Sequence, residues 1–463
     1  MKLTILGGGG VRMPAFVRAV LTGRSDAFDE ITLFEPDAFR RETIGRLSVA
    51  LGAALGYEGV VSVTPDVEEA FAGTDFVFSA IRVGGDRGRV IDEQVALGRG
   101  LVGQETTGPG GCAMALRTIP VVLAYCKLLA RIAPRAVLIN FTNPAGIITQ
   151  ALSQYGGVRS VGVCDTPSGT LERLASFLNA EQGAVSFAYS GLNHLGWISS
   201  FTVDDHERID DLLARYEELQ HFDHRFAAFD PALVRRLRAI PTEYVYYYYE
   251  PRRYVEGVAR AGTSRGQDVM RLNEELLGGL AQAFAKGDVE DAWSTYSMLM
   301  GVRRDTYMRT DTEGDNGQEE VRARRRAAAP AHLADKEIGG YEGVALRVID
   351  GLTSRRPGQV IVNTRNGASV GFLEPDDVVE VPALVHGGGI QPLAAGELTR
   401  SARGLVIQMK EYERTVVEAA VTGNAALAEL ALTLNPLVPG IGVARDLFAE
   451  YRELHGEDLA YLR

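Results

Sequence analysis

Cysteine is scarce in this chain of 463 residues, which contains only Cys112, Cys126 and Cys164. Their spacing matches neither a zinc-binding cluster nor the framework of a disulfide-stabilised secreted protein. The sequence therefore excludes a small disulfide scaffold and a zinc module. Cys126 lies in an apolar helical pattern and is expected in the core, whereas the role of Cys112, which follows two glycines, stays open.

A surplus of basic residues is also absent, because 60 Asp and Glu outnumber 48 Lys and Arg and give a net charge of −12. An acidic chain repels nucleic acid, so we expect no nucleic-acid partner. Long apolar runs are missing too, since no stretch approaches the length of a membrane span and no signal-like segment precedes the first strand. We therefore expect no membrane partner and a cytoplasmic location.

The N-terminus contains the most informative segment, an apolar run over residues 2–6 that leads directly into Gly7, Gly8, Gly9 and Gly10. A strand, a glycine turn and a helix in succession let the backbone approach a pyrophosphate, which the helix N-terminus stabilises. Glu35 ends the next apolar run, where a carboxylate would accept hydrogen bonds from a ribose hydroxyl of NAD. The pattern favours NAD binding over a plain tight turn.

The first 165 residues alternate between strand and helix patterns. This alternation predicts an α/β fold with a Rossmann-like, doubly wound parallel sheet, whose cofactor crevice lies at the carboxyl ends of the strands. Side chains that directly follow these strands should converge on the crevice. Besides the glycine loop and Glu35, they are Arg82, Asn143, Cys164 and Asp165.

The remaining chain is less regular, and its length exceeds what one core usually serves. We therefore expect two domains, an NAD-binding domain at residues 1–165 and a C-terminal α+β domain at residues 166–463 for substrate, metal and oligomerisation. The polar stretch at residues 309–337 is expected to be a solvated loop or helix face. Helices are expected at residues 168–180, 209–219, 231–239, 267–285, 405–422 and 425–433.

Three side chains could carry chemistry. Cys164 and His194 each lie beside a turn signal, and a thiolate with an imidazole suits a borderline divalent ion such as Mn²⁺. Two ligands so far apart in the sequence are not a metal motif, however, and spacing alone favours a buried structural cysteine and a hydrogen-bonded histidine. Tyr244 opens a stretch rich in phenols, of which Tyr246 to Tyr249 fit an aromatic helix face or an edge strand.

Several segments in order along the chain resemble glycoside hydrolase family four, whose members require NAD and a divalent metal. The resemblance covers nearly the whole chain. The family is an exception to hydrolysis by two carboxylates, and no such pair stands out in this sequence. Beside the glycine loop, the matching segments are residues 82–85, 103–111, 140–146, 164–167, 193–197, 241–249 and 434–438.

The resemblance implies a role for each candidate residue. Cys164 and His194 would ligate the metal, with Mn²⁺ as the expected ion, and Tyr244 would be the general base. In the implied mechanism NAD⁺ oxidises C3 of the sugar, the C2 proton is removed with help from the metal, the aglycone leaves from C1, water adds, and the hydride returns. Asp165 would protonate the departing oxygen or hold a water beside the metal. The other implied contacts are Asn143 and Asn193 to sugar hydroxyls, Arg82 and Arg265 to a 6-phosphate, and Arg82 and Asn143 to the cofactor.

Three segments give conflicting indications of the anomeric configuration of the substrate. In the family, Asp after the cysteine accompanies 6-phospho-α-glucosides, and this chain has Asp165. The segments at residues 78–85 and 241–248 resemble the β-type members, so we expect a 6-phospho-β-glucosidase, with a 6-phospho-α-glucosidase as the alternative. An NAD-dependent 2-hydroxy-acid dehydrogenase or a non-catalytic NAD-binding sensor would also account for the N-terminal pattern. We expect a homodimer or a homotetramer.

Overall fold

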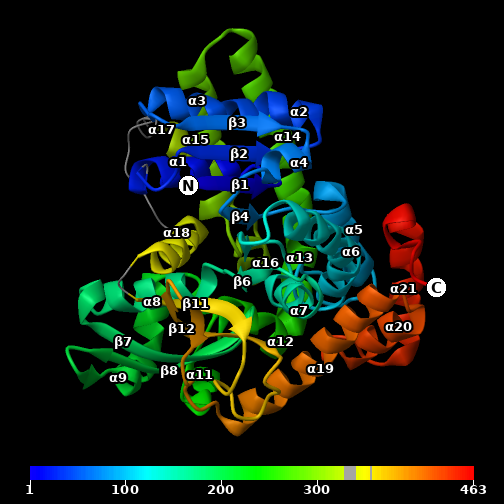
Figure 1. Ribbon diagram of the computed structural model, residues 1–463. Coiled ribbons are helices and arrows are strands. Elements are labelled where there is room, and N and C mark those ends of the chain that lie inside the picture. The colour runs from blue at the N-terminus through cyan, green and yellow to red at the C-terminus, as the bar shows by residue number, and fades with distance from the viewer. Residues whose placement is uncertain (25, 328–339, 355–356) are drawn as a thin grey trace.

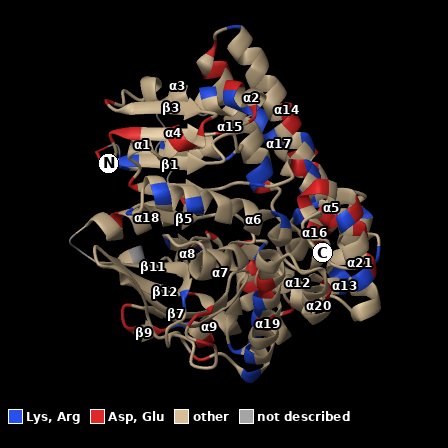
Figure 2. Ribbon diagram, turned by 45° about the vertical axis from the view of Figure 1, so that its right-hand side comes forward, with Lys and Arg blue, Asp and Glu red and all other residues tan. Residues whose placement is uncertain are grey.

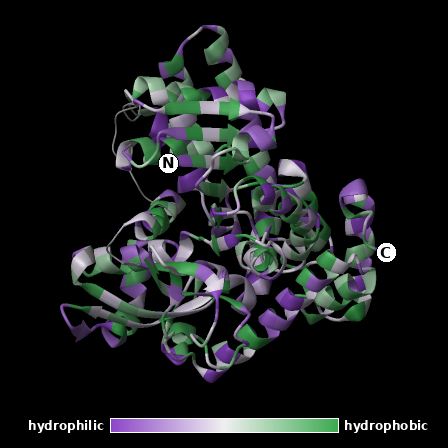
Figure 3. Ribbon diagram, in the orientation of Figure 1, coloured by the Kyte–Doolittle hydropathy of each residue, from purple (hydrophilic) through white to green (hydrophobic). Residues whose placement is uncertain are grey.

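The computed structural model describes residues 1–24, 26–327, 340–354 and 357–463, and its central feature is a mixed sheet (Figure 1). Thirteen strands of the described residues join this sheet, in the order β10-β8-β7-β12-β11-β6-β5-β4-β1-β2-β3 with β13 and β9 attached beside β12 and β8. Most of the strands consist largely of hydrophobic residues (Figure 3). In the view of Figure 2, basic and acidic residues alternate over α5 and α19 rather than separating by sign.

Six parallel strands form the N-terminal part of the sheet, in the order β3-β2-β1-β4-β5-β6. This is the doubly wound arrangement, with its ligand crevice at the carboxyl ends of β1 and β4, so the predicted Rossmann-like fold is confirmed. The sequence interpretation missed β3, an edge strand whose first residue, Val60, is 59% exposed. The strands are β1 (Lys2–Leu6), β2 (Glu30–Phe34), β3 (Val60–Thr64), β4 (Phe76–Ser79), β5 (Val137–Asn140) and β6 (Arg159–Gly162).

Helices connect these strands and cover both faces of the sheet. The first helix buries Phe16, which stacks on Phe78 of β4 with ring centroids 4.1 Å apart. The helices of this part are α1 (Met13–Gly23), α2 (Ala38–Arg40), the π-helical η1 (Arg41–Gly45), α3 (Arg46–Ala54), α4 (Val67–Phe71), α5 (Gly85–Leu97), α6 (Pro109–Ile132), α7 (Ala145–Tyr155) and α8 (Thr166–Phe177).

By length and composition alone, α6 could cross a membrane, although Arg117 and Lys127 interrupt its apolar residues. In the fold, 61% of its most apolar window is buried. It packs beside α5, α7 and α19, and Arg117 is held inside the protein by an ion pair with Asp92 at 2.7 Å. Burial against other helices thus accounts for its apolar residues.

The second part of the sheet is antiparallel and continues directly from β6. Asn363 of β11 pairs with Gly162 of β6, and Glu380 of β12 pairs with Gly191 of β7. The predicted α+β character of the C-terminal part is confirmed, whereas the division at residue 165 stays a prediction. The strands are β7 (Val185–Leu192), β8 (Leu195–Val203), β9 (His206–Glu207), β10 (Ile240–Pro241), β11 (Gly358–Arg365), β12 (Val378–His386) and β13 (Gly389–Pro392).

The helices of the second part fall into two groups along the chain, one before β11 and one after β13, and the helices of the later group lie together beside the C-terminus in Figure 1. The first group contains the short turns η2 (Gln182–Ala184), η3 (Phe226–Ala228) and η4 (Glu243–Val245) with α9 (Ile209–Ala214), α10 (Tyr216–Phe222), α11 (Pro231–Leu237), α12 (Tyr246–Tyr249), α13 (Pro251–Ala261), α14 (Arg265–Ala285), α15 (Val289–Asp305), α16 (Arg309–Glu313), α17 (Gln318–Ala327) and α18 (Gly340–Thr353). The second contains α19 (Arg400–Thr422), α20 (Ala425–Leu434), α21 (Ile441–His455) and η5 (Gly456–Leu459).

The polar stretch at residues 309–337 differs from the expected solvated segment. Asp311 in α16 is only 4% exposed, and the hydroxyl of Tyr247 donates to its Oδ2 at 2.6 Å. The expectation is therefore wrong for α16, because phenols from the tyrosine run bury this carboxylate. Arg324 of α17 is exposed as expected, and residues 328–337 lie outside the described residues.

Candidate active site

A cavity of about 850 Å³ lies at the carboxyl ends of the parallel strands and is lined by both parts of the chain. Most of the side chains predicted from the sequence meet there. Gly8 and Gly9 of the glycine loop do not line this cavity, and Asn193 lines a second, much smaller cavity. The predicted residues that line the large cavity are Gly7, Gly10, Glu35, Arg82, Asn143, Cys164, Asp165, His194, Tyr244 and Arg265.

The glycine loop forms a cradle that any side chain would fill. Gly7 has a φ of +85°, and a Cβ there would lie 2.8 Å from the carbonyl oxygen of Ala80. Gly9 donates its N–H to Glu35 at 2.9 Å, which fixes this carboxylate beside the loop. Backbone N–H groups at the start of α1 and an acid at the end of β2 fit the pyrophosphate and ribose of a dinucleotide.

His194 is presented by the tight turn between β7 and β8. Its φ of +62° lies in the left-handed region, which costs a non-glycine residue of order 1–3 kcal/mol unless the surroundings fix it. The preceding Asn193 supplies this support, because it accepts from the N–H of Gly146 at 3.3 Å and donates to Glu380 at 3.0 Å. The Asn193 side chain therefore stabilises the hairpin between β7 and β8. Unlike Tyr244 and Arg265, it does not line the large cavity.

The imidazole of His194 is buried and contacts two other side chains. Its Nδ1 lies 2.9 Å from the hydroxyl of Thr106, and its ring stacks on Tyr244. Burial lowers the pKa of His194 to about 4, although Glu105 opposes this effect. The ring is therefore neutral at pH 7, which is the form that ligates metal ions.

Cys164 follows β6 and is 6% exposed. Burial raises the pKa of its thiol, Glu380 and Asp165 raise it further, and hydrogen bonds from Thr166 oppose them. A divalent cation would stabilise the thiolate in these acidic surroundings. Asp165 precedes α8 without capping it and lines the cavity, so its carboxylate faces the same space.

A thiol and a neutral imidazole on one cavity wall fit a borderline divalent ion. Within the described residues, no group of three or more His, Cys, Asp and Glu side chains gathers as a complete metal site. The protein therefore offers Cys164 and His194, and oxygen atoms of a substrate and water would complete the coordination.

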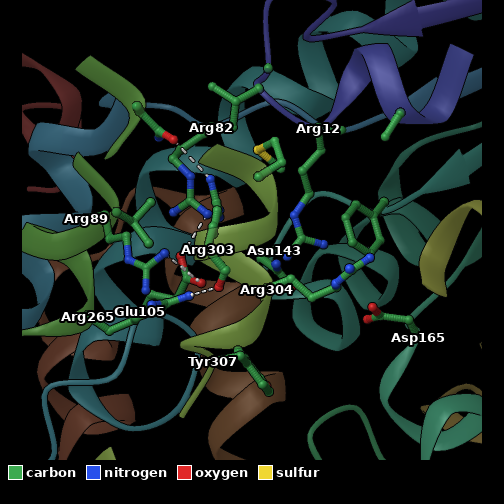
Figure 4. Close-up of a pocket in the computed structure, with 18 of the residues that line it drawn as sticks. Arg12, Arg82, Arg89, Glu105, Asn143, Asp165, Arg265, Arg303, Arg304 and Tyr307 are labelled. Carbon is green, nitrogen blue, oxygen red and sulfur yellow. Dashed lines mark hydrogen bonds and ion pairs between the residues drawn. The ribbon is translucent and has the colours of Figure 1, made fainter. Parts of the chain in front are cut away.

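Arginines form the opposite wall, where Arg82, Arg89, Arg265 and Arg303 gather around Glu105 while Asp165 lies across the cavity (Figure 4). Glu105 pairs with Arg82 at 2.7 Å and with Arg89 at 3.2 Å. Burial would raise the pKa of Glu105, yet Arg82, Arg89 and Arg303 hold it below its ordinary value.

Glu93 adds a second carboxylate, because it pairs with Arg89 at 2.8 Å, so two carboxylates face four guanidinium groups. Burial lowers the pKa of Arg303, and the charges of Arg12, Arg89 and Arg265 lower it further. The pKa of Arg265 shifts in the same direction, from burial and then from Arg89. Buried guanidinium groups that repel one another favour an added anion, and their fork geometry matches phosphate oxygens.

Tyr244 lies in η4 between the two walls. Burial raises the pKa of its phenol, Glu105 raises it further, and a hydrogen bond with Tyr307 lowers it. The tyrosines that follow have a structural role, as expected. Tyr246 and Tyr247 are buried in α12, and their hydroxyls donate to the backbone and side chain of Asp311.

The sequence interpretation missed several side chains of this site. Arg89 lies in the middle of α5, Arg303 near the end of α15, and Thr106 within a loop. No local pattern marks Arg89, Arg303 or Tyr307, because only the tertiary fold brings them to the cavity. Glu105 and Thr106 lie in the matching segment at residues 103–111, but neither was given a role, and Thr106 reaches His194 and the small cavity.

Comparisons with known proteins agree with this geometry. The model described as Family 4 glycosyl hydrolase matches residues 2–180, and the model of the Family 4 glycosyl hydrolase C-terminal domain matches residues 189–438. The chain is 28% identical, over 98% of its length and 96% of the relative's, to a probable 6-phospho-beta-glucosidase of Bacillus subtilis.

Two solved structures extend the agreement. A 6-phospho-beta glucosidase from Thermotoga maritima with manganese, NAD⁺ and glucose-6-phosphate has a TM-score of 0.78 and 26% identity, with 98% of each chain covered. A 6-phospho-alpha-glucosidase from gut microorganisms, in complex with NAD and glucose-6-phosphate, has a TM-score of 0.80 and 25% identity, with 98% of this chain and 97% of that chain covered. The two matched family models, which together span most of the chain, show that this chain belongs to family 4 of the glycosyl hydrolases.

Proposed function

We propose that this protein hydrolyses 6-phospho-β-glucosides and requires NAD and a divalent metal, Mn²⁺. One observation carries the proposal: a dinucleotide cradle, the pair Cys164 and His194, the phenol of Tyr244 and a wall of arginines all line one cavity. An NAD-binding sensor would have no use for the last three features.

The proposed chemistry assigns a task to each wall. When bound, NAD⁺ would accept and return the hydride of C3 while the C3 hydroxyl exchanges its proton with solvent, and a divalent metal held by Cys164 and His194 would polarise the sugar oxygens. Tyr244 removes the proton from C2, which the neighbouring ketone acidifies. Asp165 gives a proton to the glycosidic oxygen as the C1–O bond breaks. Water then adds at C1 and gives its proton to Asp165, which restores this acid, and Tyr244 returns a proton to C2. Reduction of the C3 ketone restores the hydroxyl, and the sugar is released with the cofactor unchanged.

The arginine wall is proposed to bind the 6-phosphate. The family resemblance implies this role for Arg82 and Arg265. Arg89 and Arg303 line the same cavity. Their buried charges explain how a chain with a net charge of −12 could bind a dianionic group. Asn143 lines the same cavity and is proposed to orient sugar hydroxyls and the cofactor, while Asn193 is proposed to act on the substrate only through the hairpin.

A second candidate is a 6-phospho-α-glucosidase. Asp165 favours it, because in the family Asp after the cysteine accompanies 6-phospho-α-glucosides, and this carboxylate lines the cavity. Relatives of both kinds match the chain over nearly its full length. We retain the β-configuration because the tyrosine segment and residues 78–85 resemble the β-type members.

One assay separates these candidates. Release of p-nitrophenol is measured from α- and β-glucosides, each with and without the 6-phosphate, in the presence or absence of NAD⁺ and Mn²⁺. We expect release only from the phosphorylated β-glucoside with both additions present, and no net NADH. Net NADH formation would indicate a dehydrogenase, and no turnover of any glucoside would contradict the glycosidase assignment.

We further propose that residues 1–165 bind NAD, that residues 166–463 supply the substrate site, and that the enzyme is a cytoplasmic homodimer or homotetramer. Phosphorylated sugars and dinucleotides are charged and do not partition into lipid, so enzyme and substrate would share one compartment. Sedimentation of the purified protein tests the number of subunits, and fractionation of cells tests the location.

A further inference from the structure

Gln104 lies in the loop before α6 and is nearly buried. Its side-chain oxygen receives three hydrogen bonds, from the N–H groups of Thr106 and Thr107, both at 2.7 Å, and from the hydroxyl of Thr106 at 2.9 Å. A backbone N–H can only donate. The two N–H groups therefore require an acceptor, which fixes the carbonyl end of the Gln104 amide at this position.

The hydroxyl of Thr106 has one proton and gives it to Gln104. The same oxygen lies 2.9 Å from Nδ1 of His194. Because its proton is already committed, the hydroxyl can only accept from the imidazole. The proton of the neutral ring is consequently on Nδ1, and Nε2 carries the lone pair.

The orientation of the ring is fixed from other directions as well. His194 stacks on Tyr244 with ring centroids 3.7 Å apart and planes 7° from parallel. Thr106 lines only the small cavity behind the hairpin, whereas His194 lines both cavities. The Nδ1 edge thus faces Thr106, and the opposite edge, with Nε2, faces the large cavity.

We propose that Gln104 and Thr106 are positioning residues that hold His194 as the Nδ1–H tautomer and so keep Nε2 available for a divalent cation. This inference rests on the proposed function only for the cation, since the hydrogen-bond pattern exists without it. A metal-ligating imidazole usually depends on such a partner, and loss of the partner lowers metal affinity by about 10- to 100-fold.

Thr106→Val tests the proposal, because valine has nearly the volume of threonine and lacks the hydroxyl. Thr106→Ser restores the hydroxyl and serves as the rescue variant. Thr107→Val is the matched control. It removes a neighbouring buried hydroxyl that has no hydrogen-bond partner, and it keeps the backbone N–H that donates to Gln104.

The first measurement is made on metal-free enzyme with ¹⁵N-labelled histidine, where the ring nitrogen shifts report the tautomer. The His194 signals are assigned by their loss in His194→Ala. We expect the Nδ1–H form in the wild type, in Thr106→Ser and in Thr107→Val, and a mixture or the Nε2–H form in Thr106→Val. The Nε2–H form in the wild type, or an unchanged tautomer in Thr106→Val, would overturn the proposal.

The second measurement is titration with Mn²⁺ alone, followed by electron paramagnetic resonance, with NAD⁺ binding as a check of the fold. We expect Thr106→Val to bind Mn²⁺ about 10- to 100-fold more weakly, with NAD⁺ affinity unchanged and Thr106→Ser close to the wild type. Equal Mn²⁺ affinity in Thr106→Val would refute the positioning role. A wild type that shows the Nδ1–H form but binds no Mn²⁺ would refute the metal dependence itself, and with it the task assigned to Thr106.

Discussion

The imidazole of His194 lies flat against the phenol of Tyr244, with ring centroids 3.7 Å apart and planes 7° from parallel. The proposed metal ligand and the proposed general base are therefore in direct contact. This proximity resolves a difficulty, because burial raises the pKa of Tyr244 above the ordinary value of a phenol. A cation held at His194 and Cys164 would lie close to the phenol and would favour its ionised form.

Removal of either proposed metal ligand should abolish turnover and spare the dinucleotide site. Cys164→Ser and His194→Ala lie outside the glycine loop and change neither its backbone nor Glu35, so NAD⁺ should bind nearly as in the wild type. Turnover with added Mn²⁺ and binding of NAD⁺ by calorimetry check both statements. Near wild-type turnover of either variant in the presence of a chelator would rule out the metal-centred assignment.

Tyr244→Phe should slow proton abstraction while preserving the fold, because the ring volume is retained. Loss of a general base costs a factor of about 10² to 10⁴, and exchange of the C2 hydrogen with deuterated solvent should fall by a similar factor. Tyr249→Phe is the control, since this phenol lies in the same tyrosine run but does not line the cavity. Unchanged exchange in Tyr244→Phe would transfer the role of base to another residue.

The sequence predicted the parts of the molecule that local patterns determine. Apolar runs followed by turns located five of the six parallel strands, and the residues after these strands, Asn143 and Cys164 among them, do reach the cavity. Val60 begins the strand that was missed, because an edge strand needs fewer apolar residues. Arg303 could not be anticipated, since its place beside Glu105 depends on how α15 packs across the crevice.

Asp311 should make the free energy of unfolding depend on pH. Burial raises the pKa of this carboxyl in the folded protein to about 6, from 3.8 for an exposed group. Between about pH 4 and pH 6 the unfolded chain loses its proton while the folded protein keeps it, so stability falls as pH rises and levels off above pH 6. The difference of about two pKa units corresponds to roughly 3 kcal/mol.

Asp311→Asn removes this titration and keeps an oxygen that can accept from Tyr247. We expect the variant to approach or exceed the wild type in stability above pH 6 and to lose that advantage near pH 4. Urea unfolding of the ligand-free proteins at several pH values measures the difference. A stability difference that stays constant from pH 4 to pH 7 would show that Asp311 does not titrate in this range.

Arg265→Ala should reduce the preference for the 6-phosphate. Loss of one charge-assisted contact costs about 1.5–3 kcal/mol, which is about ten- to a hundredfold in specificity. The ratio of kcat/KM for the phosphorylated and plain β-glucosides measures this preference. Arg225→Ala is the control, because Arg225 also lines the cavity but pairs with Asp223 at 2.9 Å. Equal turnover of both sugars by the wild type would contradict the phosphate assignment.

Asp165→Asn should affect substrates according to how much their leaving group needs a proton. The change keeps the size of the side chain and removes its acid function, so an alkyl aglycone should leave about 10² to 10⁴ times more slowly. The p-nitrophenolate anion leaves without protonation, so its release should change little. Comparison of the two aglycones on the same phosphorylated sugar isolates this effect from any loss of binding. An equal loss for both would make Asp165 a group that holds the metal site or the sugar. Faster turnover of the α-anomer than of the β-anomer by the wild type would assign the enzyme to the α-type that Asp165 favours.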